Sequence, residues 1–142
     1  MAFGFMGEYY HNLDQKNRLA VPAKIRAGLG TNFVICKPLN PELKCLFLYT
    51  KDEWDALLAS VTEGLEGVEV TKVTHRFYRS ANEVETDAQG RFTVPSSYIA
   101  YAGIEKEVCI FGSGKRVELW NPETFSAADD SEDTFDYTKV PY

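Results

Sequence analysis

Short stretches of alternating apolar and polar residues, together with short apolar runs, divide the chain into predicted strands. The alternating stretches are 8–13, 18–21, 82–86 and 91–94. The apolar runs, which predict two hairpins, are 32–36 with 45–49 and 107–111 with 116–120. The pattern therefore predicts a β-rich fold of short antiparallel strands.

Helical spacing of apolar residues predicts four short helices. Two of them begin at a proline and end near a glycine, over 22–29 and 95–102. A third starts at Thr50, which has the capping-box spacing to Glu53. The fourth lies around 69–81 and is apolar on one face. Its other face carries the basic residues Lys72, His75, Arg76 and Arg79.

One ten-residue phrase occurs twice, as LDQKNRLAVP at 13–22 and as TDAQGRFTVP at 86–95. Four residues of the phrase recur 73 positions later: Asp14, Arg18, Val21 and Pro22 match Asp87, Arg91, Val94 and Pro95. The same offset aligns Gly30 with Gly103, Ile35 with Val108 and Cys36 with Cys109, and an offset of 71 then aligns 48–54 with 119–125. The chain therefore contains two homologous halves.

Each copy of the phrase contains a predicted tight turn. Asp14 and Asp87 stand at the first turn position, where a carboxylate accepts hydrogen bonds from the local backbone. Asn17 and Gly90 stand three residues later, and both residue types tolerate a positive φ. We expect these four residues to shape the two turns.

Both halves have the same predicted order of elements: strand, turn, strand, helix and hairpin. This repeated order predicts an α+β, β-rich fold. Each half alone has too few apolar residues for a stable core. We therefore expect two pseudo-twofold, swapped-hairpin repeats that form a shared barrel-like core with short flanking helices. The expected boundaries are 1–64 for the first repeat, 65–80 for a connecting helix, 81–127 for the second repeat and 128–142 for an acidic, disordered tail.

The formal net charge of −6 is unevenly distributed. Residues 126–142 hold five carboxylates against one lysine, a net of −4, which leaves −2 for residues 1–125. Residues 10–26 hold four cationic side chains against Asp14, a local +3. A local field depends on where the charges lie, so the overall charge does not exclude an anionic partner.

The sequence predicts a cytoplasmic protein. No apolar run approaches the roughly 20 residues of a membrane span, and the first ten residues lack the regions of an export signal. Cys36, Cys45 and Cys109 match neither a zinc motif nor a disulfide framework. We expect them to be reduced packing residues.

The sequence offers no constellation of catalytic residues. His11 and His75 lack a metal-ligand spacing, and the phrase FGSGK at 111–115 lacks the full phosphate-loop pattern and lies in a predicted hairpin. No serine lies in a nucleophile elbow. We therefore expect a protein that is not an enzyme, with no cofactor, no metal and no small-molecule substrate.

The repeated arginines, Arg18 and Arg91, leave two interpretations open. Each can form an ion pair with the aspartate four residues earlier and so hold the turn. Each can instead recognise an anion, because the planar guanidinium group fits a phosphate or the edge of a guanine. Two pseudo-twofold copies suit a repeated ligand, of which duplex DNA is the commonest.

The two Asp-x-x-x-Arg phrases, with CLFLYTKDEW at 45–54 and VELWNPETF at 117–125, resemble the MraZ family of bacterial transcriptional regulators in the SpoVT–AbrB superfamily. The resemblance covers nearly residues 1–127. It implies a nucleoid-associated regulator that binds double-stranded DNA at short, G-rich direct repeats upstream of its own cell-division and cell-wall gene cluster. It also implies a ring-like homo-oligomer.

The resemblance places the DNA-contacting arginine of the first motif on Arg18 and its counterpart in the second motif on Arg91. Lys16 holds a turn position that is usually basic in the family. Gln89 stands at the equivalent position of the second copy, and we expect it to contact DNA as well. We therefore expect Lys16 and Arg18 to enter the major groove. Arg91 is expected to give a weaker second contact, because its turn carries less charge.

Three further residues are candidates for contact with DNA. Asn17 replaces the glycine usual in the family, and we expect it to touch DNA as well as to support its turn. Lys24 and Arg26 lie in the predicted helix at 22–29. For both, two interpretations remain open: a phosphate contact, or an exposed helix charge without a role.

Two other classes of function remain open. One is an antitoxin-like module of the same superfamily, which would bind a protein partner through its C-terminal region. Such modules usually carry one motif and a disordered tail, whereas this chain carries two motifs with long, structured sequence between them. The other is an enzyme with an unrecognised site.

Overall fold

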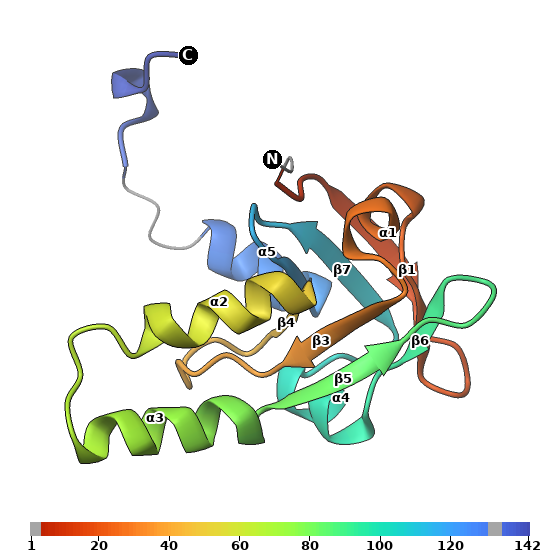
Figure 1. The fold of residues 1–142 in the computed structure, drawn as a ribbon. Helices are drawn as coiled ribbons and strands as arrows, with labels where there is room; N and C mark the ends of the chain where they lie inside the picture. The colour runs from red at the N-terminus through yellow and green to blue at the C-terminus, as the bar shows by residue number, and fades with distance from the viewer. Residues whose placement is uncertain (1–3, 131–134) are drawn as a thin grey trace.

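The computed structural model describes residues 4–130 and 135–142, and its fold is mixed α+β (Figure 1). A six-stranded antiparallel sheet has the order β1-β7-β8-β4-β3-β5, and β2 and β6 form a second, two-stranded sheet. The strands are β1 Glu8–Asn12, β2 Arg18–Ala20, β3 Asn32–Cys36, β4 Leu46–Tyr49, β5 Ala81–Glu85, β6 Arg91–Thr93, β7 Glu107–Gly112 and β8 Val117–Trp120. The helices are α1 Ala23–Leu29, α2 Lys51–Val61, α3 Val68–Arg79, α4 Ser96–Ala102, α5 Pro122–Asp130 and the 3-10 turn η1 Tyr137–Lys139.

The two halves exchange strands across the large sheet. β1 of the first half pairs with β7 of the second, and β5 of the second half pairs with β3 of the first. β4 and β8 pair in the middle. The edge strands β1 and β5 each lead through a turn into β2 and β6, which pair with each other. The prediction of two swapped repeats around one shared core is therefore confirmed.

The strand register shows how the repeats correspond in the middle of each half. Tyr9 pairs with Ile110. The counterpart of Tyr9, 73 positions later, is Asn82, and Asn82 pairs with Ile35. Ile35 is therefore the structural equivalent of Ile110, at an offset of 75.

The predicted alignment of Ile35 with Val108 and of Cys36 with Cys109 is therefore wrong by two residues. The connection from α4 to β7 is two residues longer than the connection from α1 to β3. The hairpin connection that follows is four residues shorter in the second half, measured between equivalent positions. Because these two changes have opposite signs, the sequence offset between the halves changes by a net of only two residues, from 73 to 71.

The main core lies between the large sheet and the β2–β6 pair. Both repeats contribute buried residues to it, among them Leu19, Phe33, Ile35, Leu48, Phe92, Val108, Ile110 and Leu119. The rings of Phe33 and Phe92 meet edge to face, with 5.2 Å between centroids. Burial of a large apolar side chain stabilises the fold by about 1.5–3 kcal/mol. Leu19 and Phe92 directly follow the repeated arginines, so the core holds both turns in place.

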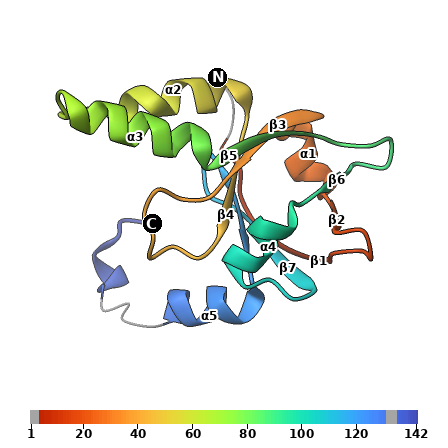
Figure 2. The ribbon, with the colours of Figure 1, turned by 90° about the horizontal axis from the view of Figure 1, so that it is seen from below.

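α2 and α3 lie side by side over the other face of the large sheet (Figure 2). The predicted helix start at Thr50 is confirmed, because the Thr50 side chain accepts a hydrogen bond from the Glu53 N–H at 3.2 Å. Trp54 of α2 stacks on Phe77 of α3, with 3.8 Å between ring centroids. The helix predicted over 69–81 ends at Arg79, two residues before the predicted end. Ala81, the last residue of the predicted helix, is the first residue of β5.

The C-terminal segment contains a helix, α5, that the apolar pattern does not predict. The Asn121 side chain accepts a hydrogen bond from the Glu123 N–H at 2.9 Å. The Phe125 ring packs against Phe111 and Trp120, with 5.3 Å and 5.7 Å between ring centroids. α5 continues three residues into the segment 128–142 that we expect to be disordered. Residues 131–134 lie outside the described residues, so the disorder of this segment stays a prediction.

All three cysteines are buried and free, which agrees with a packing role. Burial raises the pKa of the Cys36 and Cys45 thiols to about 12. Both thiols are therefore neutral at ordinary pH and unsuited to act as nucleophiles.

Two further features are absent from the described residues. None of their helices is both long enough and apolar enough to cross a membrane. In the same part of the chain, no three His, Cys, Asp or Glu side chains come together in a way that would hold a metal ion.

Candidate functional site

The two copies of the repeated phrase meet at one end of the molecule. We refer to residues 14–18 as the first turn and to residues 87–91 as the second turn. Both turns project from the same end, away from α2 and α3 (Figures 1 and 2). The strands that follow them, β2 and β6, pair with each other in antiparallel fashion.

Backbone hydrogen bonds extend this pairing from each turn to the other half. The Val21 N–H donates to the Gly90 carbonyl at 3.0 Å, and the Val94 N–H donates to the Asn17 carbonyl at 2.9 Å. Each turn is thus held by the strand end of the opposite repeat. The two turns therefore form one rigid, continuous surface.

An aspartate organises each turn, as predicted. Asp14 Oδ1 accepts hydrogen bonds from the Lys16 N–H at 2.9 Å and the Arg18 N–H at 2.8 Å. The Asn17 N–H donates to the Asp14 carbonyl at 3.0 Å, which closes the turn. The second turn repeats all three hydrogen bonds: Asp87 Oδ1 accepts from the N–H groups of Gln89 and Arg91, and the Asp87 carbonyl accepts from the Gly90 N–H.

The third residue after each aspartate has a positive φ, as the sequence predicts. Asn17 has a φ of 59° and Gly90 a φ of 75°. Asparagine is among the few non-glycine residues that adopt this left-handed conformation readily. Gly90 and Asn17 therefore play the same part in the backbone.

Arg18 forms the ion pair that the first of the two open interpretations predicts. Its Nε donates to Asp14 Oδ2 at 2.7 Å. Among the described residues, nothing accepts a hydrogen bond from its two terminal amino groups. The aspartate thus orients the guanidinium group, and two parallel donors remain for a ligand.

Arg91 is held more completely by carboxylates. Its Nε and Nη2 both approach Asp87 Oδ2, each at 2.9 Å. Its Nη1 lies 3.8 Å from Asp14 Oδ2 in the first turn. Arg91 therefore has fewer donors to offer than Arg18.

Hydrogen bonds lower the pKa of both turn carboxyl groups. The backbone N–H of Arg18 is the main cause at Asp14, and the backbone N–H of Arg91 is the main cause at Asp87. The arginine side chains lower both pKa values further. Both aspartates are therefore ionised over the whole physiological range.

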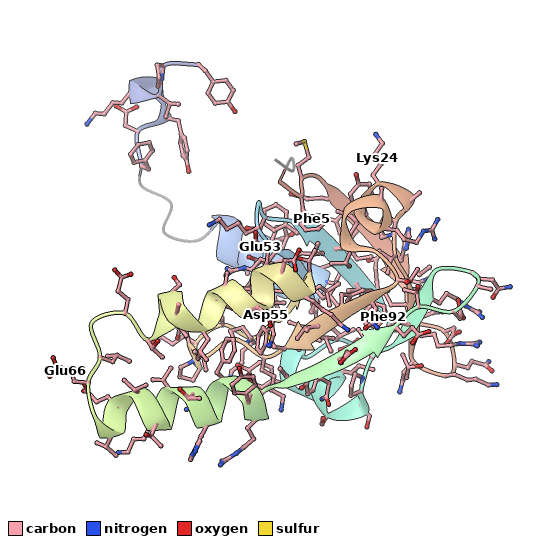
Figure 3. The ribbon with its side chains drawn as sticks, viewed as in Figure 1. Phe5, Lys24, Glu53, Asp55, Glu66 and Phe92 are labelled. Carbon is pink, nitrogen blue, oxygen red and sulfur yellow. The ribbon has the colours of Figure 1, made fainter. Side chains whose placement is uncertain are left out.

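The other predicted site residues divide into two groups. Lys16 and Gln89 are exposed in the two turns. Lys24 is exposed on α1 and in Figure 3 points away from the body of the molecule and from the turns. Arg26, only two helix positions away, faces the other way and lies against Gly90. The structure therefore adds Arg26, but not Lys24, to the turns.

Two other charged groups lie away from the turns. The basic residues of α3, namely Lys72, His75, Arg76 and Arg79, are exposed on a helix that lies away from both turns (Figure 1). Glu118 is buried in β8, where Arg116 donates to its Oε2 at 3.1 Å and the Trp120 Nε1–H donates to its Oε1 at 2.8 Å. The apolar run that predicts β8 contains no signal for this buried ion pair, which stabilises the fold and lies outside the turns.

Comparison with known proteins places both halves in one family. A family model described as "MraZ protein, putative antitoxin-like" matches residues 4–73 and 77–138. The transcriptional regulator MraZ of Clostridium beijerinckii is 44% identical over 133 residues, which cover 93% of this chain and 92% of that protein. The protein of the same name from Ligilactobacillus salivarius is 39% identical over 138 residues, with the same coverage. That from Heliobacterium modesticaldum is 42% identical over 127 residues, which cover 86% of this chain and 84% of that protein. Because these matches span both repeats, the chain belongs to the MraZ family.

Proposed function

We propose that this protein is a DNA-binding transcriptional regulator, not an enzyme, and that its two turns contact the DNA. The names of its relatives support regulation of transcription. The observation that carries the DNA contact is the geometry of Arg18. Asp14 fixes one side of its guanidinium group, and two amino donors remain on the other side, at the tip of a rigid strand pair.

Each turn residue has a proposed role that follows from its placement. Arg18 donates two hydrogen bonds to O6 and N7 of a guanine in the major groove, the commonest specific contact of arginine. Lys16 is exposed next to it and binds a phosphate or a base edge. Arg91 gives the second, weaker contact, because carboxylates already occupy more of its donors.

The remaining candidates have supporting roles in this proposal. Asn17 and Gln89 present amide groups beside the two arginines. Lys24 lies on the other side of α1, so its contact is with a backbone phosphate and not with a base.

The resemblance to the family supports a more specific target. We propose that the DNA consists of short, G-rich direct repeats upstream of the protein's own cell-division and cell-wall gene cluster, and that the protein is associated with the nucleoid. We also propose that it acts as a ring-like homo-oligomer. Linked protomers on consecutive repeats gain affinity through effective concentration, which offsets the small net charge of one turn surface.

The description of the family as "putative antitoxin-like" supports one other candidate function. An antitoxin-like module would bind a protein partner through its C-terminal region. The strand exchange weighs against this candidate, because both repeats are used to build one core and one turn surface. Binding of a co-purifying protein in place of DNA would favour it.

The experiment that tests the proposal is a titration of the purified protein with DNA from the region upstream of its gene. We expect binding to fragments that carry the repeats to be at least about a thousandfold tighter than to scrambled fragments of equal length. The logarithm of the binding constant should fall linearly with the logarithm of salt concentration, because phosphate contacts release counterions. Equal affinity for both fragments would contradict the proposal.

A further inference from the structure

We propose that Arg26 is a DNA-contacting residue of the second turn and supplies the positive charge that Gln89 does not. This inference rests on the proposed function, since it concerns the same turn surface. It assigns a role to a residue for which the sequence leaves two interpretations open.

The first step is the position of the Arg26 guanidinium group. A Cβ atom placed on Gly90 would overlap Arg26 Nη1 and would lie 2.9 Å from Arg26 Cζ and 3.0 Å from Arg26 Cδ. The arginine side chain therefore lies directly across the backbone of Gly90. Gly90 is buried although it lies in an exposed turn, which agrees with an Arg26 side chain that covers it.

The second step is the route by which Arg26 reaches the other repeat. The Val21 N–H donates to the Gly90 carbonyl, and α1 starts immediately afterwards. The Arg26 N–H donates to the Pro22 carbonyl at 2.8 Å, so Arg26 lies one helical turn beyond that junction. The β2–β6 pairing thus places α1 of the first half next to the second turn.

The third step compares the two turns. The first turn has a cation of its own, Lys16, and the helix position equivalent to Arg26 in the second half is the half-buried Ile99. The second turn has Gln89 at the position of Lys16 and receives Arg26 from α1. Each turn therefore combines one aspartate, one motif arginine and one further cation, a net of +1.

The fourth step concerns which cations remain available to a ligand. Arg91 faces two carboxylates, those of Asp87 and Asp14. Arg26 forms no ion pair with any carboxylate of the described residues. It is only partly buried, so its amino groups can reach a phosphate beside the second turn. Arg26 is thus the unpaired cation of this turn.

The test compares the affinity of variants for the repeat-bearing DNA over a range of salt concentrations. Arg26→Gln should weaken binding about tenfold and lower the salt slope by about 0.9 for each lost phosphate contact. Arg26→Gln/Gln89→Lys should return the affinity to within about threefold of the parent and the salt slope to within about 0.3 of the parent value. Arg79→Gln, which removes the same charge from exposed α3, is the matched control and should bind like the parent.

Two further variants keep the result interpretable. Arg26→Lys retains the charge and should retain affinity within about threefold; a loss as large as that of Arg26→Gln would overturn the inference. So would parental affinity of Arg26→Gln, or failure of Gln89→Lys to rescue it. Arg18→Ala separates the two proposals: if it abolishes specific binding while Arg26→Gln does not change it, only the inference about Arg26 fails. If Arg18→Ala also binds normally, the proposed DNA contact fails.

Discussion

Arg91 of the second turn faces Asp14 of the first, with 3.8 Å between Nη1 and Oδ2. The same Asp14 oxygen accepts the hydrogen bond from Arg18 Nε at 2.7 Å. One carboxylate therefore orients the arginines of both repeats. Among the ion pairs of the described residues, this contact is the one that links the two turns, so Asp14 acts on both arginines whereas Asp87 pairs with Arg91 alone.

Replacing Asp14 should reduce specificity more than it reduces binding. In Asp14→Ala, Arg18 loses its orienting partner, so we expect affinity for the repeat-bearing DNA to fall about tenfold or more. Affinity for scrambled DNA should stay equal or rise, because the turn surface gains one unit of positive charge. Titration of both fragments at one salt concentration measures the ratio. An unchanged ratio would contradict an orienting role, and Asp52→Ala, at the exposed start of α2, is the control.

The turn aspartates should make the stability of the fold depend on acid pH. Their pKa values are lowered in the folded state, so their contribution is present above the unfolded value of about 3.9. It is lost as the pH falls through the lower folded values. We expect the Tm to fall below about pH 4, and to fall less steeply in Asp14→Asn/Asp87→Asn. Thermal unfolding between pH 2.5 and pH 6 measures both curves, and parallel curves would show that these carboxylates do not contribute.

Substitution of Gly90 should destabilise the fold more than the same substitution at Asn17. Both positions have a positive φ, which costs an alanine about 1–2 kcal/mol. Gly90→Ala also has to displace Arg26, so we expect a total loss of about 2–3 kcal/mol. Urea unfolding measures the free energy. In an Arg26→Ala background the cost at Gly90 should fall to that at Asn17, and equal costs in both backgrounds would show that Arg26 does not lie on Gly90.

The buried ion pair in β8 gives a prediction that is independent of DNA. Arg116→Leu leaves the Glu118 carboxylate buried with Trp120 as its remaining donor. We expect a loss of about 2–4 kcal/mol, below the value for a fully buried pair because Arg116 is one-third exposed. Arg116→Leu/Glu118→Leu should recover most of this loss, since no unpaired charge remains. Urea unfolding measures the free energy of unfolding of both variants. A double variant less stable than the single one would show that the unpaired Glu118 charge is not the cause of the loss.

Local patterns predicted most of the fold. The strands, the four helices and the two turns follow from alternation, caps and residues that tolerate a positive φ, and these signals lie within a few residues of the elements they specify. The exchange of strands follows from the repeat, because neither half can bury a core alone. α5 also has a local signal, Asn121 before Pro122, which favours a helix start.

Features that depend on the packing of one half against the other were not predictable from the sequence. The offset of 75 between β3 and β7 is hidden by two opposite changes in loop length. The contact between Arg26 and Gly90 joins residues of different repeats and depends on the β2–β6 register. The same holds for the contact between Arg91 and Asp14. Sequence spacing can identify the residues of such a surface, but not which of them meet.

The most direct test of the central proposal is the affinity of Arg18→Ala for the repeat-bearing upstream DNA, measured beside the parent protein and the Arg79→Gln control. We expect specific binding to be lost, so that the variant binds repeat-bearing and scrambled fragments alike. Its Tm and its oligomeric state should match those of the parent, because Arg18 is partly exposed and does not belong to the core. A folded Arg18→Ala variant that binds the repeats as tightly as the parent would contradict the proposal.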